Sequence, residues 1–242
     1  ARSGRPGPVL VDIPKDLQAE EFDFIYPEEP ILLPGDNPIK NDINAKSLEE
    51  AAKLIANAER PVILAGHGIL LSGASKEVIE LSEKGDIPLS WTLLGSGAVP
   101  ASHDLNMGMM GMHGEFAANN AIQKADLLIA CGMRFDDRVT GNTKTYSLNS
   151  KKIHIEIDPS EINKNVPVDI ALVGDLKTVL RKLLPVLDKQ SNSKWIDSIS
   201  DWHKESQSRD IINMDTQMLY GAQVISDIWK ETNGDAIVVS DV

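Results

Sequence analysis

Residues 132–142 form the most informative stretch of this sequence for chemistry. Two arginines and two aspartates follow directly after an apolar run with the pattern of a buried strand: Arg134, Asp136, Asp137 and Arg138. Burying such charges is costly unless each one is paired or bound. Arg134 and Arg138 are four positions apart, so both can reach one phosphate or carboxylate group. The alternative is a loop of ion pairs on the surface.

Two glycine loops follow other apolar runs. Gly66 and Gly68 precede a predicted helix, but Leu71 stands where the dinucleotide-binding fingerprint has its third glycine. The turn can still present backbone N–H groups to a phosphate at a helix N-terminus. A plain tight turn explains these two glycines equally well. Gly95 and Gly97 form a second loop of the same kind.

A third loop, residues 108–114, contains three methionines and a histidine. Loops seldom bury long apolar side chains, and a flat, polarizable ligand ring would explain Met109, Met110 and Met112. The alternative is that these side chains fold back onto the core. His113 has no second histidine near it, so we interpret it as a hydrogen-bond donor to a ligand and not as a metal ligand.

Acidic residues stand at the ends of two later strands. Glu156 and Asp158 close one predicted strand, and Asp175 follows the next. Carboxylates at such positions commonly accept hydrogen bonds from ribose or ring N–H groups, and helix capping is the alternative for Asp158 and Asp175. Together the loops predict an extended, phosphate-bearing nucleotide with a flat ring. The sequence shows no nucleophile–base pair, no metal-ligand cluster and no P-loop.

Alternating strands and helices must position these loops. Apolar runs predict strands at residues 61–65, 88–93, 127–131, 152–157 and 170–173. Amphipathic runs predict helices at residues 47–58, 75–84, 115–124 and 175–187, the first of them opened by a capping box from Ser47 to Glu50. We therefore predict an α/β fold with a doubly wound, mainly parallel, Rossmann-like sheet, whose ligands bind beyond the carboxyl ends of the strands.

Both ends of the sequence have the pattern of a buried strand, at residues 9–14 and 236–242. We therefore expect a fragment with one complete middle domain; the alternative is a small protein with terminal strands. Proline-rich residues 18–45 predict a linker, and a polar stretch predicts a domain boundary near residue 190. Trp195 and Trp202 recur at helical spacing, which favours a helix that buries both side chains.

Composition excludes several classes of function. The 242 residues are 42% hydrophobic and 25% charged, which is typical of a globular protein. Lys and Arg number 24 against 36 Asp and Glu, for a formal net charge of −12. Non-specific binding to nucleic acid or to an anionic membrane needs a basic patch, so we expect neither partner. Cys131 is the single cysteine, which excludes an internal disulfide and favours a reducing compartment.

Three motifs resemble the catalytic subunit of biosynthetic acetohydroxyacid synthase (acetolactate synthase). They are Gly-Met-His-Gly at residues 111–114, Arg-Phe-Asp-Asp-Arg-Val-Thr-Gly at 134–141 and the run at 157–165. Residues 3–9 resemble the close of that family's pyrimidine-binding domain. The resemblance implies the end of that domain at residues 1–17, a linker at 18–45 and an FAD-binding middle domain at 46–189. It implies a linker and the start of the pyrophosphate-binding domain at 190–242.

The resemblance implies a thiamine-diphosphate-dependent enzyme. Such an enzyme decarboxylates pyruvate and condenses the two-carbon unit with a second 2-keto acid, pyruvate or 2-ketobutyrate, in valine, leucine and isoleucine biosynthesis. FAD is bound but not used for net redox chemistry. The family's activating glutamate belongs to the first domain, and its Mg²⁺ and diphosphate motif lies past Val242, so we expect this segment alone to be inactive. A homodimer or homotetramer, a regulatory small subunit and a bacterial, cytoplasmic location are further expectations.

Matched residue by residue, the resemblance implies a set of FAD contacts. They are Arg5, Gly66, His67, Gly68, Thr92, Leu93, Met110, Gly111, Met112, His113, Gly132, Met133, Arg134, Phe135, Asp136, Glu156, Ile157, Asp175 and Leu176. Asp137 and Arg138 match positions that line the substrate channel, where Arg138 faces the second keto acid. A fixed guanidinium suits a carboxylate that must be oriented. His67 departs from the family's more usual glycine, and its side chain leaves less room at the first turn.

Two other interpretations remain open at this point. The chain is also compatible with another thiamine enzyme that has the same middle domain, such as glyoxylate carboligase, an oxalyl-CoA decarboxylase or a flavin-free catabolic acetolactate synthase. It is also compatible with a free-standing nucleotide-binding module, like the flavin domain of an electron-transfer flavoprotein. The Asp-Asp-Arg-Val-Thr-Gly run favours acetohydroxyacid synthase over the other thiamine enzymes.

Overall fold

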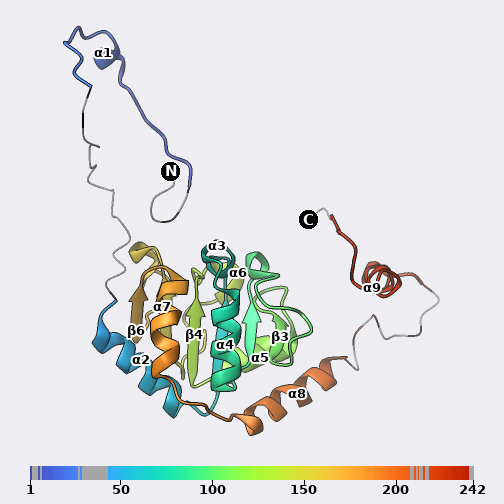
Figure 1. Ribbon diagram of the computed structural model, residues 1–242. Coiled ribbons are helices and arrows are strands. Elements are labelled where there is room, and N and C mark those ends of the chain that lie inside the picture. Colours follow the sequence, from blue (N-terminus) through green and yellow to red (C-terminus); the bar gives the residue numbers. More distant parts are fainter. Residues whose placement is uncertain are drawn as a thin grey trace.

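A six-stranded sheet lies at the centre of the protein, with helices on both of its faces (Figure 1). The computed structural model describes residues 1, 5, 7–26, 28, 43–207, 210, 212, 215 and 218–239. The strands are β1 (Pro61–Ala65), β2 (Leu89–Trp91), β3 (Asn106–Met109), β4 (Leu127–Cys131), β5 (Lys151–Glu156) and β6 (Ile170–Val173).

Every strand pair in this sheet is parallel, and the strand order is β3-β2-β1-β4-β5-β6. The order reverses between β1 and β4, which is the switch point of a doubly wound sheet. The predicted fold class is therefore confirmed. β3 was not predicted: its last two residues, Gly108 and Met109, fall in the predicted loop 108–114, and its pairing with β2 is irregular.

Helices cover both faces of the sheet. The helices of the chain are α1 (Lys15–Gln18), α2 (Ala45–Asn57), α3 (Gly68–Ser72), α4 (Ser75–Gly85), α5 (Phe116–Lys124), α6 (Asp137–Thr140), α7 (Leu176–Leu183), α8 (Ser193–Gln207) and α9 (Gly221–Glu231). Three short 3₁₀ turns accompany them: η1 (Leu93–Gly95), η2 (Pro159–Glu161) and η3 (Leu184–Val186). In Figure 1, α3 and α6 lie at the edge of the sheet where the strands end.

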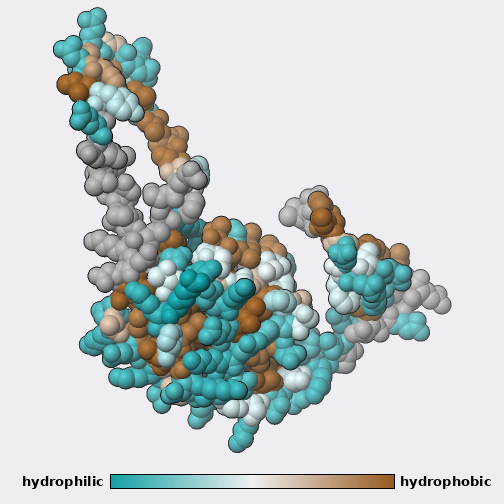
Figure 2. Space-filling model, viewed as in Figure 1, coloured by the Kyte–Doolittle hydropathy of each residue, from teal (hydrophilic) through white to brown (hydrophobic). Residues whose placement is uncertain are grey.

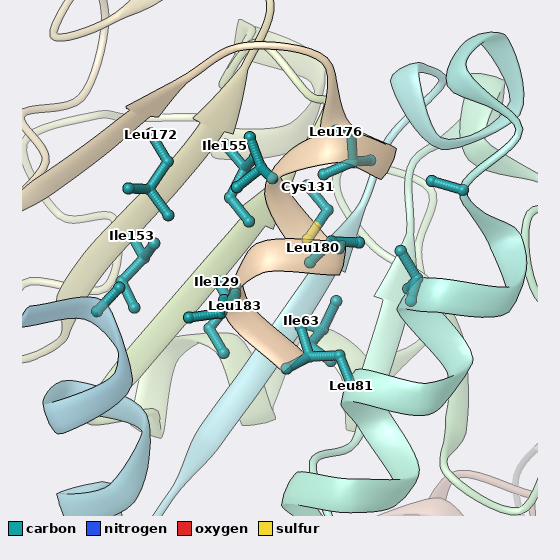
Figure 3. Packing of buried hydrophobic residues seen from close by; sticks show 14 of the residues in the cluster. Ile63, Leu81, Ile129, Cys131, Ile153, Ile155, Leu172, Leu176, Leu180 and Leu183 are labelled. Atoms are coloured by element: carbon teal, nitrogen blue, oxygen red, sulfur yellow. The ribbon is translucent and has the colours of Figure 1, made fainter. Parts of the chain in front are cut away.

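The buried hydrophobic cluster on one face of the sheet consists of aliphatic side chains and Cys131, with Trp91 partly buried against it, and we call this face the aliphatic face. Figure 3 shows Leu176, Leu180 and Leu183 of α7 lying over strand residues that include Ile129 and Ile153. α2 and α4 contribute to the same cluster. Each fully buried Leu or Ile removes enough apolar surface to contribute roughly 1.5–3 kcal/mol, so this face accounts for much of the stability.

The other face, which we call the mixed face, contains methionines and aromatic rings beside small residues. Met107, Met110, Met133, Phe135 and Trp195 are all buried in this cluster. Alanines of α5 allow that helix to lie close to the sheet, and Trp195 of α8 donates a hydrogen bond from Nε1 to the carbonyl oxygen of Pro61. The prediction that α8 buries Trp195 is confirmed, and Trp202 is partly buried against the same cluster.

Two local predictions were wrong. The capping box at Ser47 does not open α2, because the helix begins at Ala45 and Asn44 caps it by accepting a hydrogen bond from the Lys46 backbone N–H. Residues 9–14 and 236–239 form no strand, and their apolar side chains are exposed. A strand without a hydrogen-bonded neighbour is not stable in water. Figure 2 shows these apolar side chains away from the core. Residues 240–242 and most of the predicted linker lie outside the described residues.

Among the described residues, no helix combines the length and the apolar character needed to cross a membrane.

Candidate functional site

The carboxyl ends of five neighbouring strands meet at one cavity of about 530 Å³. His67 and Gly68 follow β1, Thr92 and Leu93 follow β2, and the loop after β3 supplies Met110, Met112 and His113. Residues 132–136 follow β4, and Glu156 with Ile157 stands at the end of β5. The cavity therefore lies beyond the carboxyl edge and includes the switch point, as predicted for this fold.

Two glycine loops cross at the centre of this edge. The Gly68 N–H donates a hydrogen bond of 3.0 Å to the carbonyl oxygen of Gly132. A Cβ added to Gly68 would lie 2.7 Å from the Cα of Gly132, and a Cβ on Gly66 would overlap the Gly132 carbonyl oxygen. These glycines are thus required by the contact between the loops after β1 and β4, which is an explanation the sequence analysis did not consider.

Phe135 and His154 anchor the loop after β4 to the mixed face of the sheet. Phe135 is buried with φ of 50°, an uncommon conformation for a non-glycine residue. Its ring packs edge-to-face on His154, with 5.1 Å between ring centroids. The Nε2–H of His154 donates a hydrogen bond of 2.7 Å to the Met133 carbonyl oxygen. The loop that presents residues 133–136 is therefore fixed from below.

Burial shifts the pKa values of two groups near this loop. Burial lowers the pKa of the His154 imidazole, so the neutral ring is favoured. The Nδ1 atom of His154 is buried without a hydrogen-bond partner among the described residues. Burial also raises the pKa of the Glu156 carboxyl, although the backbone N–H groups of Asp158 and Ile157 oppose that shift. Glu156 therefore stands at the cavity with one carboxylate oxygen accepting hydrogen bonds from the backbone N–H groups of Ile157 and Asp158.

The charged run after β4 divides into two parts. Arg134 pairs with Asp136 at 3.5 Å, and both side chains are about half exposed at the cavity. Asp136 also caps α6 by accepting a hydrogen bond from the Val139 backbone N–H. Arg138 lies one turn further on, and its guanidinium donates a hydrogen bond of 3.7 Å to the Met112 sulfur. Both arginines line the cavity. Arg134 also forms an ion pair, as the alternative interpretation of this run as a surface loop of ion pairs predicted.

Arg5 reaches the cavity from the segment before α1. Its guanidinium lies 3.5 Å from an Asp158 carboxylate oxygen and 3.2 Å from one of Glu161. The Ser160 hydroxyl and then Arg5 lower the pKa of the Asp158 carboxyl. Asp158 also caps η2 through the Ser160 backbone N–H, so the capping alternative is correct for this residue.

Most of the predicted ligand residues line the cavity, and five do not. Gly66 and Gly111 are buried in backbone contacts, and Asp137 is exposed outside the cavity. Asp175 caps α7 by accepting hydrogen bonds from the Thr178 backbone N–H and hydroxyl, which is the alternative weighed for it. Leu176 is buried in the aliphatic face.

Three residues that were not predicted also line the cavity: Leu71, Leu94 and Val139. Met109, one of the loop methionines predicted to contact a flat ring, lines it too. Leu71 and Leu94 are more than 60% exposed, so their apolar side chains form an accessible rim. Each lies within three positions of a predicted contact, so proximity in the sequence was the available signal. The described residues hold no group of three or more His, Cys, Asp or Glu side chains suited to a metal ion.

A doubly wound parallel sheet with a cavity at its switch point defines a Rossmann-like α/β domain. Residues 48–183 match the family model described as thiamine pyrophosphate enzyme, central domain. The chain therefore belongs to the thiamine pyrophosphate enzyme family, through its central domain.

Curated relatives of this chain are named as acetolactate synthase large subunits. The chain is 48% identical over 211 residues to the probable acetolactate synthase large subunit of Methanocaldococcus jannaschii, covering 85% of this chain and 36% of the relative. It is 42% identical over 247 residues to the acetolactate synthase large subunit of Corynebacterium glutamicum, covering 100% and 39%. It is 37% identical over 249 residues to acetolactate synthase isozyme 3 large subunit of Escherichia coli, covering 100% and 43%.

The resemblance predicted from the three motifs is confirmed by these matches. The chain spans 36% to 43% of the length of these three relatives.

Proposed function

We propose that this chain is the central part of an acetolactate synthase large subunit, and that its cavity binds FAD. The observation that carries the proposal is the convergence of five strand ends on one cavity that contains most of the residues implied as FAD contacts. Relatives named acetolactate synthase large subunit, aligned over the whole chain, support the activity.

The residues at the cavity fit a flavin dinucleotide. A volume of about 530 Å³ lies in the range of ligand pockets, and this one is open at its apolar rim. Gly68 and Gly132 keep side chains out of this part of the cavity, while Arg5 and Arg134 supply positive charge for a diphosphate. Met110 and Met112 suit a flat ring, and the buried Glu156 carboxyl suits ribose hydroxyls.

When bound, FAD supplies structure to the active site and no net redox chemistry, as the resemblance implies. Arg138 is the residue of this chain proposed to act on substrate. Its guanidinium stands at the cavity mouth, held by the Met112 sulfur, where it can bind and orient the carboxylate of the second 2-keto acid. Asp137 is exposed beside it and is proposed to line the same channel.

The remaining features belong to the proposed complete subunit. We infer thiamine diphosphate and Mg²⁺ binding by parts outside this chain, with pyruvate and 2-ketobutyrate as substrates. The domain division at residues 1–17, 18–45, 46–189 and 190–242 is part of the same proposal. So are a homodimer or homotetramer, a regulatory small subunit and a cytoplasmic location.

The proposed role of Arg138 predicts a specific defect. In the complete large subunit, Arg138→Ala should lower the rate of condensation by roughly 10–100-fold, because a charge-assisted hydrogen bond to the second substrate is lost. Decarboxylation of the first pyruvate should fall much less. Acetolactate and released carbon dioxide are measured together, with Arg60→Ala, at the amino end of β1, as the control. Equal loss of both products would contradict the role, and absence of acetolactate from the wild type would contradict the function.

A further inference from the structure

Asn119 of α5 holds the loop after β3 by both polar groups of one glycine. Its Oδ1 accepts a hydrogen bond of 2.9 Å from the Gly111 N–H, and its Nδ2 donates one of 2.9 Å to the Gly111 carbonyl oxygen. Beyond the end of β3, the side-chain amide satisfies the Gly111 N–H and shares the Gly111 carbonyl oxygen with the Gly114 N–H, which donates to it at 2.9 Å. Asn119 does not line the cavity.

Gly111 is the point where this loop meets α6. Its φ of 99° favours glycine, and an added Cβ would lie 2.5 Å from the Arg138 carbonyl oxygen. The next residue, Met112, donates its backbone N–H to that same carbonyl oxygen at 2.8 Å. A change in the orientation of the Gly111 peptide groups would therefore move Met112 against Arg138.

The side chains of Met112 and Arg138 repeat the backbone contact at the cavity mouth. The Arg138 guanidinium donates to the Met112 sulfur at 3.7 Å, and both residues line the cavity. The contacts form one series: Asn119 holds Gly111, Gly111 fixes Met112, and Met112 contacts Arg138 through backbone and side chain.

We propose that Asn119 is a positioning residue that sets the orientation of Met112 and, through it, of the Arg138 guanidinium. This inference rests on the proposed function for its effect on catalysis, but its structural part stands independently. A residue that served only the stability of α5 would have no reason to affect Arg138.

Amide hydrogen exchange on the 242-residue chain tests the structural part. Asn119→Ala should speed exchange of the Met112 amide roughly tenfold, because its acceptor on Arg138 remains but the loop that aligns it is released. The amides of β1 and β4 should keep their protection. The control is Asn120→Ala on the same helix, since the Asn120 side chain makes no hydrogen bond among the described residues, and it should leave Met112 unchanged. Unchanged exchange at Met112 in Asn119→Ala would overturn the proposal.

A second variant covers the case in which Asn119→Ala does not fold. Asn119→Asp keeps the acceptor for the Gly111 N–H but sets a carboxylate oxygen against the Gly111 carbonyl oxygen, so it too should speed exchange of the Met112 amide. In the complete large subunit, both variants should raise KM for the second 2-keto acid more than they lower the rate of decarboxylation. An equal fall in both steps would overturn the link to Arg138. If the wild type makes no acetolactate, the proposed function fails, while the exchange result still decides the structural role.

Discussion

The two faces of the sheet are built from different chemistry. The aliphatic face contains Ile, Leu, Val and Ala side chains with one buried thiol, Cys131. The mixed face contains methionines and aromatic rings, and beside them the buried Tyr146 hydroxyl and His154 Nδ1 have no hydrogen-bond partner among the described residues. The buried hydrophobic side chains that line the cavity, Met110, Met133 and Phe135, all belong to the cluster of the mixed face.

This difference in composition indicates that the two faces have different roles. Aliphatic side chains have few polar demands and pack densely, which favours stability. Methionines and aromatic rings have specific shapes and contacts, and polar groups among them stay buried only at a cost. We infer that the mixed face contributes less to the free energy of unfolding and shapes the loop after β4, whereas the aliphatic face contributes more and stabilises the sheet.

The largest expected effect is on the aliphatic face. Leu180→Ala removes a fully buried side chain of α7 that packs against the sheet (Figure 3). We expect the free energy of unfolding to fall by about 2–5 kcal/mol, from lost burial and the cavity that remains. The FAD affinity of the folded protein should not change. Val186→Ala, at an exposed site of η3, is the control, with an expected effect within about 0.5 kcal/mol. Loss of FAD affinity in a folded Leu180→Ala variant would contradict the inference that the aliphatic face serves stability and not the cavity.

A smaller loss of stability is expected where the loops after β1 and β4 cross. Gly68→Ala places a Cβ 2.7 Å from the Gly132 Cα, so backbone must move. Such overpacking costs roughly 1–3 kcal/mol. Because both loops line the cavity, FAD binding should weaken as well. Gly221→Ala is matched to it, since a Cβ at Gly221 meets nothing within 4 Å. Chemical denaturation measures the stability of both variants, and titration measures their affinity for FAD. A Gly68→Ala variant with the stability and FAD affinity of the wild type would refute the close contact between the two loops.

The smallest effect concerns pH and the mixed face. Burial holds the pKa of His154 below its ordinary value of 6.5, so between the two values the unfolded chain binds more protons than the native protein. Stability from this group is therefore complete above pH 6.5 and is lost as the pH falls through that window. Wild type should lose stability relative to His154→Gln as the pH falls below about 6.5.

Comparison at matched pH cancels most contributions of groups distant from residue 154. It does not cancel that of Glu156, whose Oε2 lies 3.9 Å from the His154 Nε2. Parallel pH profiles for wild type and His154→Gln, measured by chemical denaturation, would show that the ring is not buried as described.

The regular part of the fold was predictable because its signals are local. The runs at β1, β4 and β6 are continuous and apolar, and their bounds were predicted correctly. β3 was missed because Asn and Gly are poor strand formers, and its position depends on pairing with β2. Asn44 was missed as the cap of α2 because Ser47 offered a second capping pattern three residues later.

The site was predictable at the level of strand ends but not of contacts. Parallel topology brings the ends of β1 to β5 to one edge, so the lining glycines, methionines and arginines could be named from the sequence. The packing of Gly68 on Gly132 and the two hydrogen bonds of Asn119 to Gly111 depend on tertiary structure. No periodicity or motif in the chain encodes them.

Titration with FAD tests the central claim most directly, namely that the edge formed by these five strands is a flavin site. Arg134 at the cavity and Arg60 at the amino end of β1 have side chains of nearly equal exposure, 48% and 45%. The flavin-depleted complete subunit should bind one FAD per chain, and Arg134→Ala should weaken binding roughly tenfold while Arg60→Ala leaves it unchanged. Absence of saturable binding, or an equal effect of both substitutions, would contradict the account.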